Sequence, residues 1–195
     1  MNPILIDVPE IFESERLTIR APKPGDGAEL HTAVEETYDD LKAWMPWAKE
    51  RQTVEDLETF VRNSCAEFIS RKNLFMLLFL KGTGTLVGGS GLHGINWNIP
   101  CFEIGYWCRE RFQGQGYITE STAAITKFAF ETLGAKRVEI RCDSQNVKSR
   151  RVPERLGFRL EATLKNSVLS TSGEVRDGLI FAKTNEDWVK ETGCS

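Results

Sequence analysis

Two glycines, Gly114 and Gly116, lie two residues apart between a segment typical of a strand and a segment typical of a helix. The first turn of a helix carries unpaired backbone N–H groups and the positive end of the helix dipole, so it attracts anions. Glycines there let the backbone approach a phosphate, because no Cβ stands in the way. The segment has neither the Gly-Lys-Ser/Thr of a Walker loop nor the spacing of a dinucleotide-binding GxGxxG. Alone, the pair favours a turn over a site.

A second candidate lies 30 residues further along, where Asn146 and Ser149 begin a segment with helical character. Asparagine at such a position can cap the helix and still offer its amide to a ligand. The Ser149 hydroxyl, on the first turn, can donate or accept a hydrogen bond. Taken separately, a helix cap and a neutral surface residue explain these two side chains better than a site does.

Strands and helices must bring these residues together, and the hydrophobic periodicity predicts both. It predicts strands at residues 15–20, 73–81, 85–94, 102–108, 137–142, 158–165 and 177–183. It predicts helices at residues 26–37, 53–68, 116–133 and 146–156. An aromatic loop is expected at residues 38–47. The order predicts a mixed α/β fold, with residues 1–195 forming a single domain.

The composition argues against several classes of protein. A net charge of −3 gives no support for nucleic-acid binding. The longest apolar run, Leu74–Leu80, is far too short to cross a membrane, and the N-terminus does not resemble a signal peptide, so we expect a soluble cytoplasmic protein. Five scattered cysteines without a CxxC pair, and only two histidines, argue against a disulfide framework and against a metal site.

Three motifs in a fixed order together resemble the GNAT superfamily of acyl-CoA N-acyltransferases. They are an opening ESERLTIR at residues 13–20, a central EIGYW at residues 103–107 and a late NxxSxxxxExxGF at residues 146–158. They look most like the RimJ/RimL branch, the ribosomal-protein N-terminal acetyltransferases. The resemblance extends from Arg16 to Phe181, which is most of the chain.

The resemblance implies a central, mostly antiparallel sheet that is flanked by helices and splayed at a cleft for acetyl-CoA. The strand Phe102–Cys108 is implied to splay from its neighbour, so that the pantetheine pairs with exposed backbone. The turn Arg111–Gly116 is implied to bind the pyrophosphate, and Asn146 and Ser149 to contact the cofactor arm and its sulfur. The residues implied to bind the cofactor are Tyr106, Trp107, Cys108, Arg111, Phe112, Gln113, Gly114, Gln115, Gly116, Tyr117, Asn146 and Ser149.

The implied chemistry is direct attack of an amine on the thioester in one ternary complex. Exposing the free amine at pH 7 costs roughly 1 kcal/mol for an α-amine of pKa ~7.8 and roughly 4.6 kcal/mol for a lysine of pKa ~10.4. An α-amine therefore needs only a modest base. Glu103 is the candidate, because the family often places a carboxylate on this strand; an exposed strand carboxylate is the competing interpretation. A backbone N–H near Tyr106–Cys108 would meet the oxyanion.

One position departs from the family pattern. Many members carry a tyrosine in the helix after Asn146 to protonate the leaving thiolate, and here the matching residue is Pro153. Proline lacks the N–H expected inside a helix, so a kink or an early break is expected. Ser149 is then the remaining partner for the sulfur, as a stabiliser rather than an acid. One or two of the basic residues Lys148, Arg150, Arg151, Arg155 and Arg159 are expected at the 3′-phosphate.

The acceptor is less well specified. Tyr38, Trp44, Met45, Trp47, His93 and Trp97 are candidates for the wall of its pocket, with Glu103 beside it. A protein N-terminus is expected, and the alternatives are a small amine such as an antibiotic, polyamine or amino acid, or a non-catalytic acyl-CoA sensor. The acidic residues Glu35, Glu36, Asp39 and Asp40 give a small point to a polyamine. The oligomeric state is open, with a homodimer as one option.

Overall fold

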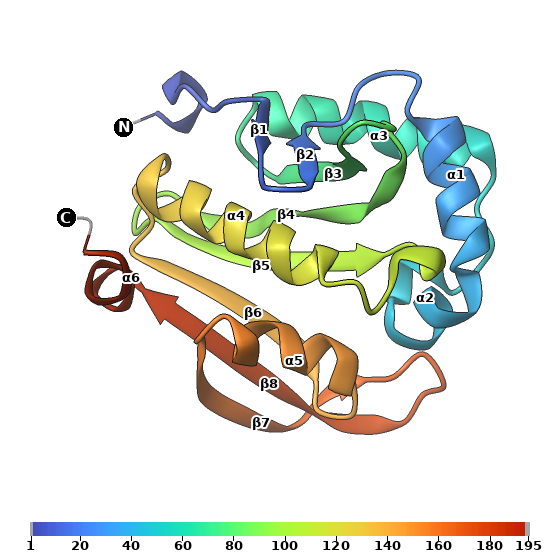
Figure 1. The fold of residues 1–195 in the computed structure, drawn as a ribbon. Helices are drawn as coiled ribbons and strands as arrows, with labels where there is room; N and C mark the ends of the chain where they lie inside the picture. Colours follow the sequence, from blue (N-terminus) through green and yellow to red (C-terminus); the bar gives the residue numbers. More distant parts are fainter. Residues whose placement is uncertain (1, 194–195) are drawn as a thin grey trace.

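The computed structural model describes residues 2–193, so that Cys194 lies outside the described residues. One sheet of eight strands, in the order β1-β2-β3-β4-β5-β6-β8-β7, runs through the molecule (Figure 1). Of its seven pairings only β5–β6 is parallel, which confirms the expected mixed, mostly antiparallel architecture. The strands are β1 (Ile11–Glu13), β2 (Leu17–Arg20), β3 (Leu74–Leu80), β4 (Leu86–Asn96), β5 (Cys101–Cys108), β6 (Arg137–Asp143), β7 (Arg159–Leu169) and β8 (Val175–Thr184).

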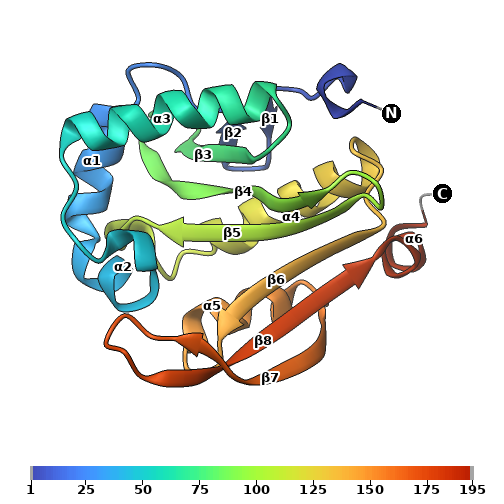
Figure 2. The same cartoon turned by 180° about the vertical axis from the view of Figure 1, so that it is seen from behind.

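Helices cover both faces of the sheet. On the face seen in Figure 1 lie α4 (Tyr117–Glu131) and α5 (Val147–Arg155). The opposite face, seen in Figure 2, carries α3 (Val54–Ile69), and α1 (Gly27–Glu36) and α2 (Tyr38–Trp44) stand at one end. The last helix, α6 (Asn185–Thr192), lies at the other end, where both termini emerge. Short 3-10 turns occur at Pro3–Leu5, Pro46–Ala48 and Glu110–Phe112.

Each face of the sheet has its own core, because successive strand residues point to opposite sides. Ile104 of β5 packs with Ile125 and Phe128 of α4. Trp107 of the same strand packs instead with the helices α1 and α3, through residues such as Leu57. The alternation therefore sends Glu103 and Trp107 to the α3 face, and Tyr106 and Cys108 to the face of α4 and α5.

The parallel pair β5–β6 is short. Its register joins only Cys101 to Arg137, Phe102 to Val138 and Glu103 to Glu139. Beyond that point β5 continues to Cys108 and β6 to Asp143, with no further pairing between them in residues 2–193, and Figure 1 shows the two strands diverging. An unpaired edge presents backbone N–H and C=O groups to whatever enters the gap. The implied splay of the sheet is confirmed.

Three expectations for local structure were wrong or incomplete. The expected loop 38–47 is mostly helical: Asp39 and Asp40 stand in the first turn of α2, where the dipole favours acids, and Leu41 is buried. The strand β1 and the helix α6 were missed, although α6 begins with a capping box at Thr184 and Asp187. Of the kink or early break expected at Pro153, the early break does not occur, because α5 runs through this residue.

Candidate active site

The turn between β5 and α4 is built from two glycines with left-handed backbone. Gly114 has φ of +74° and Gly116, the N-cap of α4, has φ of +83°. No other part of the described chain lies within 4 Å of the place where a Cβ of Gly114 would stand. Conformation, rather than lack of space, therefore requires glycine at position 114. The turn leaves the first N–H groups of α4 open to a ligand, the arrangement that suits a phosphate.

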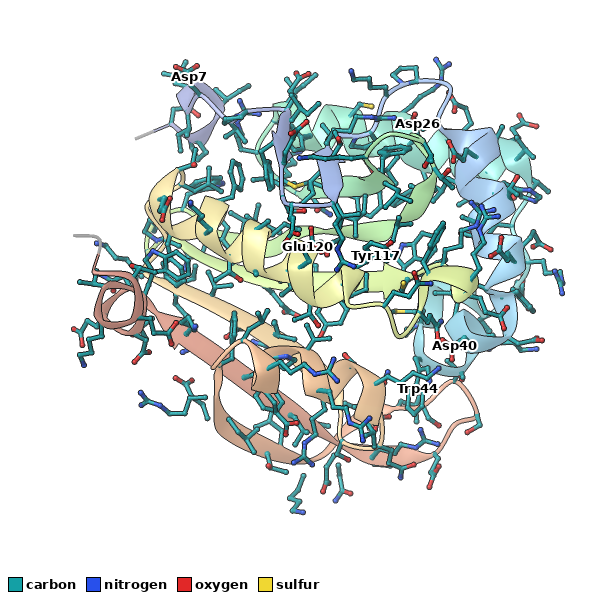
Figure 3. All side chains as sticks on the ribbon, in the orientation of Figure 1. Asp7, Asp26, Asp40, Trp44, Tyr117 and Glu120 are labelled. Atoms are coloured by element: carbon teal, nitrogen blue, oxygen red, sulfur yellow. The ribbon has the colours of Figure 1, made fainter. Side chains whose placement is uncertain are left out.

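Arg16 and Glu120 fasten this turn to strand β2. Glu120 accepts hydrogen bonds from the Arg16 Nε at 2.6 Å, from the Arg16 backbone N–H at 2.7 Å and from the Ser14 hydroxyl at 2.6 Å. The Arg16 guanidinium also donates to the Gln115 carbonyl and lies 4.4 Å from the centre of the Tyr117 ring. Figure 3 shows Tyr117 and Glu120 together at the start of α4. Sequence analysis missed both Arg16 and Glu120 as site residues.

The electrostatics of Glu120 suit its position. A carboxylate in the first turn of a helix would repel a bound phosphate. Partial burial raises its pKa, but the hydrogen bonds from Ser14 and Arg16 outweigh burial and hold the pKa of Glu120 below its usual value. Glu120 is therefore ionised at neutral pH, and the cation of Arg16 compensates its charge.

A second set of contacts holds the start of the turn. Arg109 is 5% exposed, and its Nε lies 2.7 Å from the Glu36 carboxylate of α1. The same carboxylate accepts from the backbone N–H of Arg111. Next to it, Gln113 donates to Asp40 of α2 and accepts from Lys148 of α5 at 3.0 Å. The turn is thus held from both α1 and α2, and Figure 3 shows Asp40 on the side of α2 that faces it.

A cavity of about 510 Å³, here called the cofactor cleft, opens between this turn, the edge of β5 and α5. The polar groups of its wall include Gln113, Asn146, Lys148, Arg151 and Arg155. Arg151 and Arg155 have no ion pair within residues 2–193, so their charges are available to a ligand. The other two basic residues of the expected set are engaged elsewhere: Arg150 with Glu154 and Arg159 with Asp187.

The start of α5 is capped as expected, and a tyrosine replaces the backbone donor that its proline lacks. The Asn146 Oδ1 accepts the Ser149 N–H at 3.0 Å. In a regular helix the N–H of residue 153 would donate to the Ser149 carbonyl, but Pro153 has none. The Tyr106 hydroxyl, from β5, donates to this carbonyl at 2.9 Å and lies 3.3 Å from the Ser149 Oγ. Burial raises the pKa of Tyr106, so its hydroxyl remains a donor.

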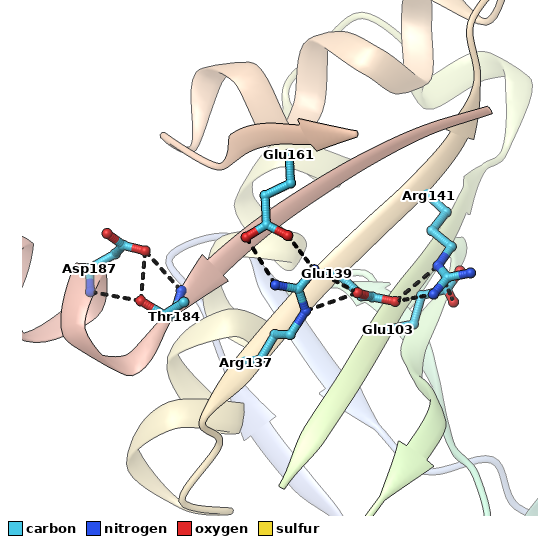
Figure 4. A network of polar contacts seen from close by, with 7 residues as sticks. All are labelled: Glu103, Arg137, Glu139, Arg141, Glu161, Thr184 and Asp187. Atoms are coloured by element: carbon cyan, nitrogen blue, oxygen red, sulfur yellow. Dashed lines mark hydrogen bonds and ion pairs between the residues drawn. The ribbon is translucent and has the colours of Figure 1, made fainter. Parts of the chain in front are cut away.

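A second cavity, the acceptor cavity, lies on the opposite face of β5 and has a volume of about 490 Å³. Glu103 stands in it beside His93 and Arg141, with Glu103 oxygens 3.9 Å from the His93 Nε2 and 3.4 Å from the Arg141 Nε. Figure 4 shows Arg141 between Glu103 and Glu139. Burial raises the pKa of Glu103 above the usual value, against the opposing effects of His93 and Arg141. A raised pKa makes this carboxylate a stronger base than an exposed one.

The two cavities meet across the gap between β5 and β6. Met45, Tyr106, Trp107 and Ser149 border both of them. A third hollow of about 330 Å³, between the 43–46 segment, β6 and the β7–β8 hairpin, also reaches Ser149 and Met45. Ser149 therefore stands where a group bound on one face of the sheet can reach a group bound on the other.

The remaining expected residues divide into two sets. Phe112, Gly114, Gly116, Tyr117 and Cys108 border the cofactor cleft, as does Trp107, whose side chain packs between α1 and α3. Arg111 and Gln115 build the turn but are not among the residues that border the cleft in residues 2–193; the Gln115 amide donates to the Arg111 carbonyl.

Of the residues expected around the acceptor, Trp47, Met45 and His93 border the acceptor cavity, whereas Trp44 borders the cofactor cleft. Tyr38 and Trp97 border none of the three cavities of the described chain: the Tyr38 hydroxyl donates to the Lys49 carbonyl, and the Trp97 ring packs on Phe102. Arg141 is a member of the site that sequence analysis missed.

The acidic run of α1 and α2 does not form a mouth for the acceptor. Glu35 pairs with Arg51, Glu36 with Arg109 and Asp40 with Lys148, and none of these acids borders the acceptor cavity of the described chain. The slight support that this run gave to a polyamine acceptor is therefore removed.

Among residues 2–193, none of the helices combines the length and the apolar character that crossing a membrane requires.

A phosphate-type turn, an unpaired strand edge beside it and a carboxylate across the gap are the parts that an acyltransferase using an acyl-CoA would need. Comparison with known proteins agrees. Residues 16–159, well over half of the chain, match the family described as an acetyltransferase (GNAT) domain. The chain belongs to the GNAT family and is an acetyl-CoA-dependent N-acetyltransferase.

Among its relatives, the chain is 28% identical over 179 residues to YdaF of Bacillus subtilis (strain 168), proposed by name to be a ribosomal N-acetyltransferase, with 91% of this chain and 96% of YdaF covered. It is 26% identical to the ribosomal-protein-serine acetyltransferase of Escherichia coli (strain K12), over 74% of this chain and 86% of that protein. The fold matches RimL, a ribosomal L7/L12 alpha-N-protein acetyltransferase solved with coenzyme A, with a TM-score of 0.85, 24% identity and coverage of 91% and 99% of the two chains.

The left-handed turn generates the first prediction. Gly114→Ala places a Cβ on a backbone at φ of +74°, which costs about 1–2 kcal/mol and shifts the turn away from its phosphate-binding shape. We expect the affinity for coenzyme A to fall about tenfold or more, as measured by titration calorimetry. Gly173→Ala is the matched control: Gly173 also has a positive φ and open space around it, but it lies in the β7–β8 turn. Equal affinity of both variants for coenzyme A would contradict the assignment.

The Tyr106–Ser149 contact generates the second prediction. Tyr106→Phe leaves the Ser149 carbonyl without a donor, because Pro153 has no N–H, and we expect the free energy of unfolding to fall by about 1–3 kcal/mol. Pro153→Ala restores a backbone donor for the same carbonyl. In that background Tyr106→Phe should cost clearly less, as measured by urea denaturation of the four proteins of the cycle. A cost that is the same in both backgrounds would show that the two residues are not coupled.

Proposed function

We propose that this enzyme transfers the acetyl group of acetyl-CoA to the α-amine of a protein N-terminus, with a ribosomal protein as the acceptor. The observation that carries the proposal is the meeting of the two cavities at Tyr106 and Ser149, which gives an amine on one face of β5 access to a thioester on the other. The names of two relatives, a ribosomal N-acetyltransferase and a ribosomal-protein-serine acetyltransferase, support the choice of acceptor. A ribosomal acceptor would place the enzyme in the cytoplasm.

The chain offers a matching group for each part of the cofactor. The N–H groups that follow Gly114 and Gly116 suit a pyrophosphate, and the unpaired cations of Arg151 and Arg155 suit the remaining phosphate. The free edge of β5 beyond Glu103 offers backbone hydrogen bonds to the amides of the pantetheine arm. The bound cofactor supplies an acetyl thioester, an acyl group already activated toward an amine.

Glu103 is the proposed general base. It lies in the acceptor cavity, and its raised pKa brings it closer to that of the amine it serves. An α-amine of pKa ~7.8 is already partly deprotonated at pH 7. Deprotonating the rest costs roughly 1 kcal/mol, so Glu103 needs to provide only that much. Deprotonating a lysine ammonium at pH 7 would cost roughly 4.6 kcal/mol. A single, partly exposed carboxylate is poorly suited to provide this much.

The hydroxyls of Ser149 and Tyr106 are the proposed partners of the departing sulfur. The Tyr106 hydroxyl donates to the Ser149 carbonyl, the Ser149 hydroxyl donates to the Tyr106 oxygen at 3.3 Å, and both residues border the two cavities. Two cysteines stand near the same gap, but burial raises the pKa of Cys108 to about 12 and that of Cys142 to about 11. Thiols protonated at neutral pH are poor nucleophiles, which supports direct transfer to the amine over a route through an acyl-cysteine.

A panel of acceptors tests the proposed function. We expect release of free coenzyme A, followed with a thiol reagent, in the presence of peptides with a free N-terminus. Mass spectrometry should locate the added acetyl group on the α-amine, and peptides with a blocked N-terminus and an internal lysine should be inert. Turnover only on free polyamines or amino acids would identify a small-molecule enzyme instead. Binding of acetyl-CoA without turnover on any amine would identify a sensor.

The raised pKa of Glu103 gives the third prediction a defined pH dependence. The base acts as the carboxylate, so kcat/KM of the wild type should rise through the pKa of Glu103, above the ordinary value, and again through that of the amine. Glu103→Gln should lack the rise that comes from ionisation of Glu103. We expect its kcat/KM at pH 7 to fall about 100-fold or more, and to recover partly at pH 9, where the amine is deprotonated. A pH–rate profile identical to that of the wild type would remove Glu103 from this role.

Stability provides the control for that variant. The pKa of Glu103 is higher in the folded than in the unfolded protein, so its ionisation opposes folding. The free energy of unfolding therefore falls as the pH rises from the unfolded-state pKa to the folded-state pKa. At pH 7 Glu103→Gln should therefore unfold at no lower temperature than the wild type. Glu161→Gln removes a carboxylate of β7, three strands from β5 in the sheet, that pairs with Arg137 of β6 (Figure 4), and we expect its pH–rate profile to be unchanged.

A further inference from the structure

We infer that the acceptor of this enzyme carries a large apolar group next to its amine, as in a polypeptide that begins with leucine, methionine or phenylalanine. The inference rests on the proposed function and narrows its substrate class. The serine named for one relative is a small, polar residue, so the inference separates this chain from that protein.

The inner wall of the acceptor cavity is apolar. It is formed by α1, α3, the 45–47 segment and β3, and the residues that matter here are Leu30, Trp47, Leu57, Phe60 and Phe75. Phe60 is 41% exposed and Trp47 is 43% exposed, although both border a concave space. The rings of Phe60 and Phe75 meet edge to face at 5.1 Å and form a continuous aromatic surface. Rings that face a cavity rather than a packed core gain free energy when an apolar ligand covers them.

The floor of the cavity has few side chains. Gly89 and Gly91 of β4 and Gly105 of β5 border it, and a Cβ on Gly105 would stand 2.8 Å from the Nε2 of His93. The absence of this Cβ lets the His93 ring lie over β5 beside Glu103. A Cβ on Gly89 would stand 3.0 Å from the Phe75 ring, so the glycine also leaves room for the aromatic wall. The glycines thus give room to His93 and Phe75, two of the side chains that border the cavity.

The cavity has two unlike ends. At the Glu103 end, His93 and Arg141 supply polar and charged atoms, and this end opens toward Ser149. The other end is walled by Phe60, Leu57 and Leu30. Gln52, Asn73 and Ser90 are further polar residues that border the cavity, and Gln52 has a buried Oε1 without a hydrogen-bond partner in residues 2–193. An acceptor whose ammonium lies at Glu103 would therefore direct its first side chain onto the aromatic wall.

The size of the space agrees with this occupant. A volume of about 490 Å³ lies within the range of sites that hold whole small molecules. A serine or alanine side chain would leave most of it to water against exposed aromatic rings. A leucine or phenylalanine side chain would displace that water, and discrimination of about tenfold per methylene-sized group is usual for an apolar pocket.

A set of hexapeptides that differ only in the first residue tests the inference. We expect kcat/KM for peptides that begin with leucine, methionine or phenylalanine to exceed that for serine and alanine peptides at least tenfold. Phe60→Ala should reduce this ratio at least fivefold, because the apolar first side chain loses part of the aromatic wall that it covers. Ile69→Ala is the matched control, an exposed apolar residue of the same helix that borders none of the three cavities of the described chain, and its ratio should be that of the wild type.

Two outcomes would overturn the inference: equal or better use of the serine peptide by the wild type, or a ratio that Phe60→Ala does not alter. A binding experiment separates this failure from failure of the proposed function. In the presence of coenzyme A, phenethylamine should bind in titration calorimetry at least tenfold more tightly than ethanolamine, and Phe60→Ala should abolish the difference. If no amine is acetylated and this difference persists, the cavity inference stands and the transfer function fails. If peptides are acetylated without preference for the first residue, the transfer function stands and the cavity inference fails.

Discussion

The site depends on one constraint, the separation of β5 and β6 after three parallel residue pairs. A continued pairing would satisfy the edge of β5 and close the gap between the two cavities. Because the strands diverge, the edge remains available on the cofactor side, while Glu103, at the last pair, is held at the point of divergence. The same separation lets Tyr106 reach across to Ser149 of α5. In the proposed mechanism, cofactor binding, access between the cavities and the placement of the base thus share one structural cause.

The turn that precedes α4 contains two glycines, which make it intrinsically flexible, and two ion pairs hold it in place. Two glycines with positive φ give it its shape but little rigidity. Arg16 and Glu120 attach its end to β2, and Glu36 attaches its beginning to α1 through Arg109. Both pairs are formed by residues far apart in the sequence and partly removed from water, where they are screened less than surface pairs. A phosphate bound at the proposed site would therefore meet N–H groups that are already oriented.

Much of the fold could be predicted from the sequence, because its signals are local. The capping box of α3, the alternation in β6 and the glycines at 114 and 116 act over a few residues and gave the correct elements. The remaining features depend on distant contacts. Arg16 meets Glu120 across 104 residues, and α2 is stabilised by packing that the aromatic pattern of residues 38–47 does not reveal. Arg141 could have been suggested as a neighbour of Glu103 only from the parallel register of β5 and β6.

Pro153 shows how a local exception becomes part of the site. Where the family resemblance implies a tyrosine, the chain has a residue that leaves the Ser149 carbonyl without a helical partner. Its own β5 provides the phenol that satisfies this carbonyl. The tyrosine hydroxyl thus stands beside Ser149 but reaches it from the sheet instead of from the helix, at 3.3 Å from the serine oxygen. A phenol bound to a carbonyl is oriented and remains protonated, so in the proposed mechanism it would act on a departing sulfur as a fixed dipole rather than as a free acid.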